Sequence, residues 1–323
     1  MMKFRSMSKK FLLIILLYLM IFHLNVFAKA SDKVQELIFD NSHFKTVEGI
    51  DLHYRIWMPE NDIPVGNVLL VHGLGASTFS WRYVAPELSR HGFLVIAVDL
   101  PGFGLSQRRP AFEQSHESRA DILWGLIKDL NIPGGWHLAG HSMGGGVVAA
   151  MALQRPCETV SLTLTAGLVE RDSRFLNKLF SRSRVLRNIA GKVISRLFLT
   201  RRRVKSFLVS AYGREPTTEE LEGYYKPLRL KDTYLTLVNL FKSHSSDKEL
   251  PDKAVTMDIP VLFIWGREDN WVPVNKGEEL EEKMPNSRMA IIEEAGHCPM
   301  ETHPEDFNFH FINFLKNLEI NSF

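Results

Sequence analysis

The sequence contains few cysteines and no pattern typical of a metal site. Only Cys157 and Cys298 are present among 323 residues, too few for a disulfide framework, and we expect both to be free thiols. No C-x-x-C, H-E-x-x-H or EF-hand spacing occurs, so we expect neither a metal nor a cofactor. No internal repeat is visible. The sequence therefore gives no support for a disulfide-stabilised, metal-dependent or repeat protein.

Charge of one sign is not in excess either. The chain has 39 Lys and Arg against 37 Asp and Glu, a formal net charge of +2. This balance argues neither for nor against a nucleic-acid partner, and we expect none. A composition of 45% hydrophobic and 24% charged residues is typical of a soluble globular enzyme. The length allows one large domain or two small ones. No N-x-[ST] sequon occurs, which favours a bacterial envelope over a glycosylating secretory pathway.

The N-terminus has the pattern of an export signal or an anchor. Four basic residues among the first ten precede an apolar run at 11–22, and Ala28-Lys29-Ala30 matches the A-x-A cleavage pattern. The unbroken run is shorter than the roughly 20 residues that span a bilayer, but extended to Ala28 it is long enough. We predict that residues 1–30 are a signal peptide, or alternatively a membrane anchor. The protein is then exported, periplasmic or secreted, or tethered to the membrane by residues 11–28.

After the leader, apolar strands alternate with helical periodicity. A hairpin is expected at 34–47 and 52–58, followed by buried strands at 68–71, 93–98, 136–139, 161–165, 261–265 and 288–292. Helices are expected at 79–91, 117–130, 144–150, 275–284 and 304–318, with Ser115 as the cap of the second. Such alternation predicts an α/β protein with a mostly parallel sheet covered by helices on both faces.

The segment Gly140-His141-Ser142-Met143-Gly144 fits G-x-S-x-G, the nucleophile elbow. An apolar strand precedes it and a helix of small residues follows. The turn between them is so sharp that a Cβ at either glycine would collide with backbone, and the serine takes a strained conformation. Its hydroxyl is then held at the N-terminus of a helix, where developing negative charge is favoured. The alternative is a glycine-rich connection with an ordinary serine.

With this motif the chain after the leader resembles the α/β-hydrolase family. The motifs that carry the resemblance stand in the family's order: His72-Gly73-Leu74-Gly75, Asp99-Leu100-Pro101-Gly102-Phe103-Gly104-Leu105-Ser106, Gly140-His141-Ser142-Met143-Gly144-Gly145, Gly266-Arg267-Glu268-Asp269 and Gly296-His297-Cys298-Pro299. The resemblance implies hydrolytic chemistry on an open eight-stranded sheet and does not name the substrate. A serine at the elbow argues against haloalkane dehalogenase or epoxide hydrolase activity, for which family members carry aspartate there.

A serine hydroxyl needs a base, and the base needs a carboxylate to orient it. His297 is the best candidate base, because it follows the last predicted strand in the order Ser…Asp…His. Weaker candidates lie in the earlier loops and near the last helix: His72, His141, His303 and His310. The resemblance implies Asp269 as the acid, with turn capping as its alternative role. Glu268 is the main rival, and Asp247 and Asp258 are lesser ones.

The oxyanion of the intermediate needs two amide donors. The amide of Met143 supplies one, and the amide of Leu74, flanked by glycines, is expected to supply the other.

Two further residues in these motifs could be mistaken for catalytic groups. We interpret Asp99 as a turn-forming residue rather than a second catalytic carboxylate, and Cys298 as structural rather than nucleophilic.

The alternation of strands stops between Gly167 and about Lys253. Apolar residues at helical spacing interleave with basic ones from 176 to 205, and further helical portions run over 218–225 and 231–241. This stretch resembles the helical cap that family members insert after the sixth strand. We predict a core at 31–167 plus 254–323 and a cap at 168–253. The basic residues are interpreted as a solvated face; the alternatives are a surface against anionic lipid and a site for an anionic substrate.

These residues favour a serine hydrolase acting on a small-molecule carboxylic ester or related acyl compound. Ser142 would attack, His297 would carry the proton, and Asp269 would orient His297. Two alternatives stay open. The first is hydrolysis of a C–C bond on the same fold, and the second is a ligand-binding receptor or scaffold that retains the fold and the triad.

Overall fold

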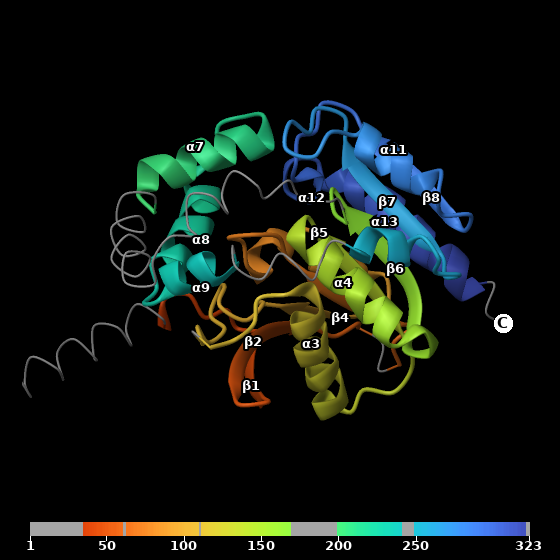
Figure 1. The fold of residues 1–323 in the computed structure, drawn as a ribbon, viewed down its shortest axis with the longest axis horizontal. Coiled ribbons are helices and arrows are strands. Elements are labelled where there is room, and N and C mark those ends of the chain that lie inside the picture. Colours follow the sequence, from red (N-terminus) through yellow and green to blue (C-terminus); the bar gives the residue numbers. More distant parts are fainter. Residues whose placement is uncertain (1–34, 61–62, 110, 169–198, 241–248, 321–323) are drawn as a thin grey trace, which may run out of the picture. The chain divides into compact units, whose positions relative to one another are not determined.

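The computed structural model describes residues 35–60, 63–109, 111–168, 199–240 and 249–320 (Figure 1). The chain divides into two compact units, residues 1–40 and 41–323, and every element named below lies in the second. The predicted leader, residues 1–30, falls outside the described residues. Among the described helices, none combines the length and the apolar content needed to cross a membrane.

Eight strands form one sheet in the order β1-β2-β4-β3-β5-β6-β7-β8. Pairs β1–β2 and β2–β4 are antiparallel and all other neighbours are parallel. The mostly parallel eight-stranded sheet was predicted, and it is confirmed. The strands are β1 (Ser42–Val47), β2 (Ile50–Trp57), β3 (Asn67–Val71), β4 (Leu94–Val98), β5 (Trp136–His141), β6 (Thr159–Thr165), β7 (Val261–Gly266) and β8 (Ser287–Ile292).

The expected hairpin is present, but its first strand begins at Ser42 rather than at residue 34. Val47 pairs with Ile50, so only Glu48 and Gly49 form the loop. Both have positive φ, 49° and 73°, the combination that a type I′ turn requires. This turn follows the right-handed twist of the strands, which is why two residues suffice to reverse the chain.

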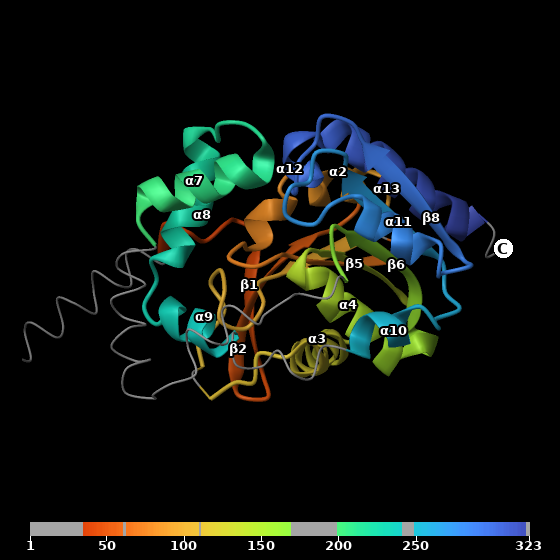
Figure 2. The same cartoon turned by 45° about the horizontal axis from the view of Figure 1, so that its top comes forward.

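Helices cover both faces of the sheet (Figure 2). α3 (His116–Leu130), α4 (Met143–Gln154), α10 (Leu250–Ala254) and α11 (Asn275–Glu281) pack on the face of Leu69 and Val71. α2 (Ala85–Arg90), α12 (Pro299–Thr302) and α13 (Pro304–Ile320) pack on the face of Val68 and Leu70. Successive residues of a strand point to opposite faces, so the side chains of β3 alternate between the two hydrophobic cores, one on each face of the sheet.

One predicted helix is divided. The stretch 79–91 forms a 3-10 turn, η1 (Thr78–Trp81), and then α2, which begins at Ala85. Pro86 explains the break, because proline has no N–H and is tolerated only in the first turn of a helix. By contrast, α3 starts within one residue of its predicted position. The Ser115 hydroxyl accepts a hydrogen bond from the Ser118 amide at 3.2 Å, as the predicted cap requires.

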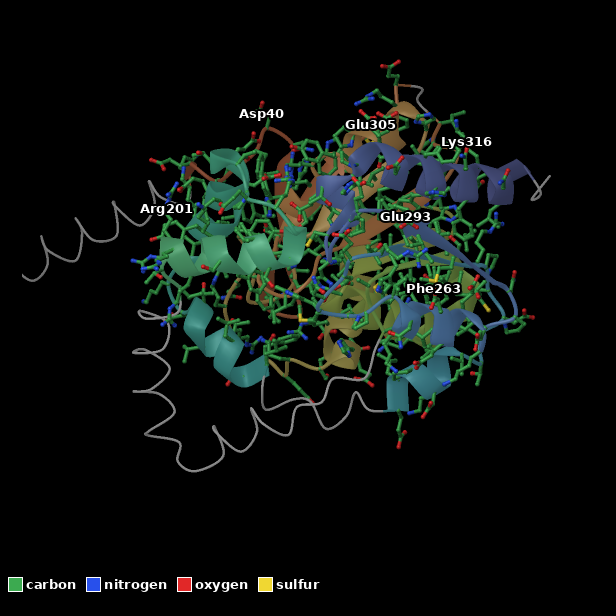
Figure 3. All side chains as sticks on the ribbon, turned by 90° about the horizontal axis from the view of Figure 1, so that it is seen from above. Asp40, Arg201, Phe263, Glu293, Glu305 and Lys316 are labelled. Atoms are coloured by element: carbon green, nitrogen blue, oxygen red, sulfur yellow. The ribbon has the colours of Figure 1, made fainter. Side chains whose placement is uncertain are left out.

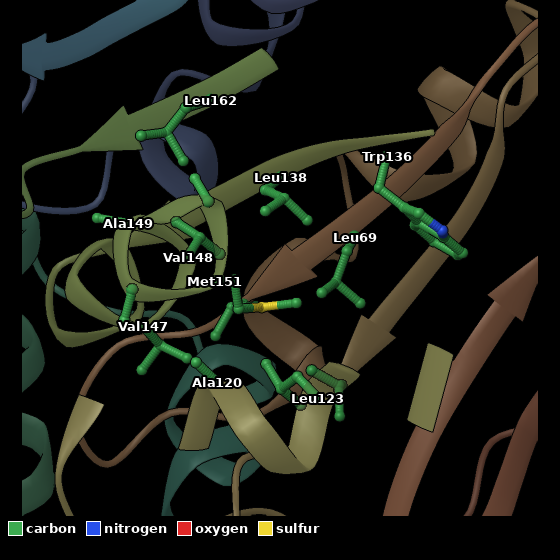
Figure 4. Close-up of a cluster of buried hydrophobic side chains, with 14 of the residues drawn as sticks. Leu69, Ala120, Leu123, Trp136, Leu138, Val147, Val148, Ala149, Met151 and Leu162 are labelled. Atoms are coloured by element: carbon green, nitrogen blue, oxygen red, sulfur yellow. The ribbon is translucent and has the colours of Figure 1, made fainter. Parts of the chain in front are cut away.

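The core on the α3–α4 face is built from aliphatic side chains of consecutive elements (Figure 4). Leu69, Leu138 and Leu162 come from β3, β5 and β6, and they meet Val148 and Met151 of α4. All five are at most 1% exposed. At about 25 cal/mol per Å² of apolar surface removed from water, such side chains hold α4 firmly on the sheet. The N-terminus of α4 is thereby fixed at the end of β5.

The described helices between β6 and β7 are α7 (Arg201–Tyr212), α8 (Thr218–Leu228), α9 (Thr233–Leu240) and α10. The predicted portions 218–225 and 231–241 correspond to α8 and α9. The predicted amphipathic stretch from 176 to 198 lies outside the described residues. Basic residues line the first turns of α7, and Figure 3 shows Arg201 at its outside. Arg201 and Lys205 pair with Glu222 and Glu215 at 2.8 and 2.7 Å.

Candidate active site

Ser142 stands at a backbone turn that only glycine neighbours allow. Its φ of 51° and ψ of −118° are strained for a residue with a side chain. A Cβ on Gly140 would collide with the Gly144 carbonyl and lie 2.7 Å from the Gly145 amide nitrogen. A Cβ on Gly144 would collide with the Val71 carbonyl. The turn from β5 into α4 is therefore the sharp elbow that the sequence predicts.

The elbow places Ser142 beside the loop that follows β3. The amide of Ser142 donates to the Thr165 carbonyl at 2.8 Å, which ties the elbow to β6. A Cβ added to Gly73 would lie 3.2 Å from Ser142 Cβ, so the side chain of Ser142 faces this glycine. Ser142 is also the residue immediately before α4, where helix amides favour negative charge.

Asp269 and His297 are joined by a hydrogen bond. His297 Nδ1 lies 2.7 Å from Asp269 Oδ2, and the two residues are 2% and 4% exposed. The other carboxylate oxygen, Oδ1, accepts from the amides of Trp271 and Val272 at 2.8 and 2.9 Å. Asp269 thus caps its own turn and contacts the imidazole at the same time.

The two rival acids that the structure describes do not occupy this position. Glu268 and Asp258 are exposed, and Asp247 lies outside the described residues. The packing of the turn after β7 accounts for the difference, because it buries Asp269 against the His297 loop and leaves Glu268 exposed. Asp269 points inward to His297 and Glu268 points to solvent.

The imidazole of His297 lies between two other rings. The ring of His141 is 4.8 Å away between centroids, and the indole of Trp271 is 4.9 Å away at an interplanar angle of 33°. His141 directly precedes Ser142, so the elbow and the imidazole are neighbours. No hydrogen bond joins the Ser142 hydroxyl to His297 in the part of the chain that the structure describes. Such contacts are often long before substrate binds. The complete relay of Ser142, His297 and Asp269 remains a prediction.

His141 supports the loop of His297 through the backbone. Its Nε2 lies 2.8 Å from the His297 carbonyl oxygen, which can only accept, so Nε2 carries the proton. Burial lowers the pKa of His141 well below its ordinary value, and the nearby His297 lowers it further. The ring is consequently neutral, and its buried Nδ1 has no hydrogen-bond partner in the described residues. No sequence pattern predicts this role of His141.

The other candidate histidines serve the loops around the site. His72 accepts from the Leu100 amide at 3.0 Å through Nε2 and donates to the Gly73 carbonyl at 2.7 Å through Nδ1. Burial lowers the pKa of His72, in keeping with a neutral ring. His303 contacts Thr302 at 3.0 Å, and His310 lies on α13. Among the described residues, none of the three forms a hydrogen bond or an ion pair with Asp269.

The two amides predicted for the oxyanion are available. Met143 is the first residue of α4, and the first amides of a helix have no intrahelical acceptor. Leu74 lies in the loop after β3. Neither amide donates a hydrogen bond within the described ranges of the chain. The start of α4 packs on this loop, since a Cβ on Gly144 would lie 2.6 Å from the His72 carbonyl oxygen.

Asp99 organises the loops rather than reaching the site. Its carboxylate accepts from the Thr78 and Leu105 amides at 2.6 and 2.7 Å and from His53 Nδ1 at 2.7 Å. Burial by itself raises the pKa of Asp99, but His53, His72 and the Leu105 amide together hold it below its usual value. Asp99 therefore ties the segment after the Leu74 loop to the end of β4. These hydrogen bonds agree with our interpretation of Asp99 as a turn-forming residue.

Cys298 is a buried thiol next to His297. Burial raises its pKa well above the usual value, and Glu301 and Asp269 raise it further. A thiol that resists ionisation is a poor nucleophile. Cys157 is exposed, and neither cysteine forms a disulfide.

Comparison with known proteins identifies the fold and the enzyme class. A family model described as alpha/beta hydrolase fold matches residues 66–304. A 2-hydroxy-6-oxononadienedioate/2-hydroxy-6-oxononatrienedioate hydrolase of Burkholderia vietnamiensis is 30% identical over 270 residues, covering 79% of this chain and 90% of the relative. A pimeloyl-[acyl-carrier protein] methyl ester esterase of Aeromonas salmonicida is 27% identical over 248 residues, covering 75% and 92%.

Among solved structures, a serine hydrolase involved in carbazole degradation aligns with a TM-score of 0.69 and 24% identity, over 85% of this chain and 98% of its own. Such a likeness concerns the fold alone. The sheet order, the elbow and the match over most of the sequence lead to one conclusion: the chain is a hydrolase that belongs to the α/β hydrolase fold family.

Proposed function

We propose that the protein is a serine hydrolase that cleaves a carboxylic ester or a related acyl compound. Ser142 is the nucleophile, His297 the general base and acid, and Asp269 the residue that orients His297. The observation that carries the proposal is the 2.7 Å hydrogen bond between His297 Nδ1 and Asp269 Oδ2. It leaves Nε2 as the nitrogen that takes the serine proton.

In the first half of the reaction, Ser142 Oγ attacks the acyl carbon while its proton moves to His297 Nε2. The amides of Leu74 and Met143 hold the resulting oxyanion. Collapse of the intermediate breaks the bond to the leaving alcohol, which receives the proton from His297. Water then attacks the acyl-serine, His297 takes a proton from that water, and the acid is released as Ser142 is restored.

Two substrate classes have support. The relative that is named a methyl ester esterase supports cleavage of an ester. The 30% identical hydrolase of Burkholderia vietnamiensis acts, by its name, on oxo-dienedioates, and this favours hydrolysis of a C–C bond in a keto acid as the second candidate. We assign the same serine, base and oxyanion donors to both reactions.

We propose in addition that the leader, residues 1–30, exports the protein or tethers it to a membrane.

The basic residues of α7 are best interpreted as a solvated face, because Arg201 and Lys205 are already paired with glutamates. Sedimentation with vesicles tests the lipid alternative. Greater recovery with phosphatidylglycerol than with phosphatidylcholine vesicles would overturn the solvated-face interpretation.

Labelling with a fluorophosphonate probe tests the nucleophile directly. We expect one label per chain, at Ser142, and none in Ser142→Ala. A panel of p-nitrophenyl esters from acetate to laurate, together with a 2-hydroxy-6-oxo-dienoate, then separates the substrate classes. Turnover of the dienoate without turnover of any ester would favour the second candidate. Binding of these compounds with no turnover and no labelling would contradict both.

A further inference from the structure

The last turn of α7 ends against the loop that carries His297. The His297 amide donates to the Ala211 carbonyl at 2.7 Å. The last carbonyls of a helix lack intrahelical donors, so this contact satisfies one of them. A Cβ on Gly296 would lie 2.5 Å from the same carbonyl oxygen. The glycine before His297 thus permits a backbone contact between an inserted helix and the candidate base.

α7 also contacts the loop of Asp269 through Trp271. The indole Nε1 donates to Ser210 Oγ at 2.9 Å, and the ring packs on Phe207 with centroids 4.5 Å apart. The same indole lies 4.9 Å from the His297 ring. α7 is therefore joined to His297 twice, once through the backbone and once through this aromatic stack.

A single buried carboxylate, Glu301, gathers the segments around this contact. Its Oε1 accepts from the Tyr224 hydroxyl of α8. Its Oε2 accepts from the Tyr212 hydroxyl of α7 at 2.8 Å and from Arg82, which follows η1. The side chain of Glu301 has no exposed surface. Glu301 lies four residues after His297, so it links α7 and α8 to the loop of the base.

The charges and hydrogen bonds around Glu301 hold the segments that meet there together. Burial raises the pKa of Glu301 above its usual range, and Arg82 and the two tyrosine hydroxyls offset part of that rise by stabilising the charged form. Both carboxylate oxygens accept hydrogen bonds, which satisfies the charged form. Arg82 also lies 3.4 Å from Glu220 of α8. A buried carboxylate held from three sides by separate chain segments resists their separation, because each lost donor leaves charge unpaired.

We propose that Glu301 is a positioning residue for the base: by clamping α7 and α8 it keeps the Ala211 carbonyl on the His297 amide and the imidazole in its working place. The inference rests on the proposed role of His297. If Glu301 merely stabilised the fold, its loss would lower the melting temperature and leave turnover by the folded enzyme unchanged.

The test uses the full-length chain with Glu301→Gln and with the double variant Tyr212→Phe/Tyr224→Phe, which keeps both rings and removes both hydroxyls. Tyr225→Phe is the matched control, because it removes a neighbouring hydroxyl of α8 that makes no hydrogen bond among the described residues. Amide hydrogen exchange follows the peptide that contains His297. The rate of p-nitrophenyl acetate hydrolysis is measured well below the melting temperature of each variant. It is divided by the amount of reactive serine, which titration with the fluorophosphonate gives.

In both test variants we expect exchange at the His297 amide to rise about tenfold or more and kcat to fall about tenfold or more. KM should stay within about twofold, because the clamp holds the base rather than the substrate. Tyr225→Phe should match wild type in both measurements. The double variant keeps the proposal testable if Glu301→Gln does not fold.

Wild-type exchange at His297, or wild-type kcat per titrated serine, in the double variant would overturn the proposal whatever the melting temperature. Failure of the proposed function looks different. In that case the wild-type chain itself is neither labelled by the fluorophosphonate nor active, while the exchange measurement still reports whether Glu301 holds the loop.

Discussion

Lowering the pH from 7 to 5 should weaken the fold through His141. This histidine is buried between the elbow and the His297 loop, and burial lowers its pKa well below the ordinary 6.5. In the unfolded chain the same ring titrates near 6.5. Below that pH the unfolded state binds a proton that the folded state does not, so acid favours unfolding. The stabilisation is fully present above pH 6.5 and is lost as the pH falls towards the folded pKa.

The size of the effect follows from proton linkage. Each proton bound only by the unfolded state changes the free energy of unfolding by about 1.4 kcal/mol per pH unit. With an unfolded pKa of about 6.5 and a ring that stays neutral in the folded state, the loss between pH 7 and pH 5 is about 2 kcal/mol. His72 and the carboxylates also contribute to the pH dependence, so the measurement must isolate His141.

Comparison with His141→Gln isolates it, because a glutamine amide can donate to the His297 carbonyl but does not titrate. Urea unfolding at pH 5, 6 and 7 gives the free energy for both proteins. We expect wild type to lose about 2 kcal/mol more than the variant between pH 7 and 5. His303→Gln is the control and should follow wild type. Parallel pH curves for wild type and His141→Gln would refute the argument, because they would mean that His141 is protonated in the folded state.

Three further predictions concern the site and its surroundings. Asp269→Asn should lower kcat for ester hydrolysis by about 10⁴-fold, because an amide no longer holds the base in the right tautomer; steady-state kinetics with less than a tenfold loss would contradict its role. Gly144→Ala should cost about 1–3 kcal/mol, since its Cβ meets the Val71 carbonyl, and an unchanged melting temperature would argue otherwise. Iodoacetamide should label Cys157 but not Cys298 in the native chain, as intact-mass spectrometry would show.

Much of the architecture could be predicted because it depends on local pattern. The apolar run at β3 and the small residues of α4 have the periods of a buried strand and a closely packed helix. The elbow is equally local: two glycines and a serine at fixed spacing determine the turn, whatever surrounds it. The break before α2 is local as well, because Pro86 is tolerated only in the first turn of a helix.

For the candidate site, the sequence predicts which loops carry the residues but not which side chains in those loops meet. The order of strands places Ser142, Asp269 and His297 at the same edge of the sheet, since the carboxyl ends of parallel strands meet there. Spacing alone did not separate Asp269 from Glu268, because one residue decides which side chain points inward. Burial of one and exposure of the other came from the packing of the turn after β7.

What the sequence by itself determined is the framework: the alternation of strands and helices, the glycines of the elbow and the serine between them. Tertiary structure alone decided which groups support the candidate base. His141, Trp271 and Glu301 carry no motif for these roles, and their partners lie far away in the chain, as with Tyr212 and Arg82. The physical reason is that a period or a turn depends on neighbouring residues, whereas a buried hydrogen bond depends on two surfaces that meet only after the chain has folded.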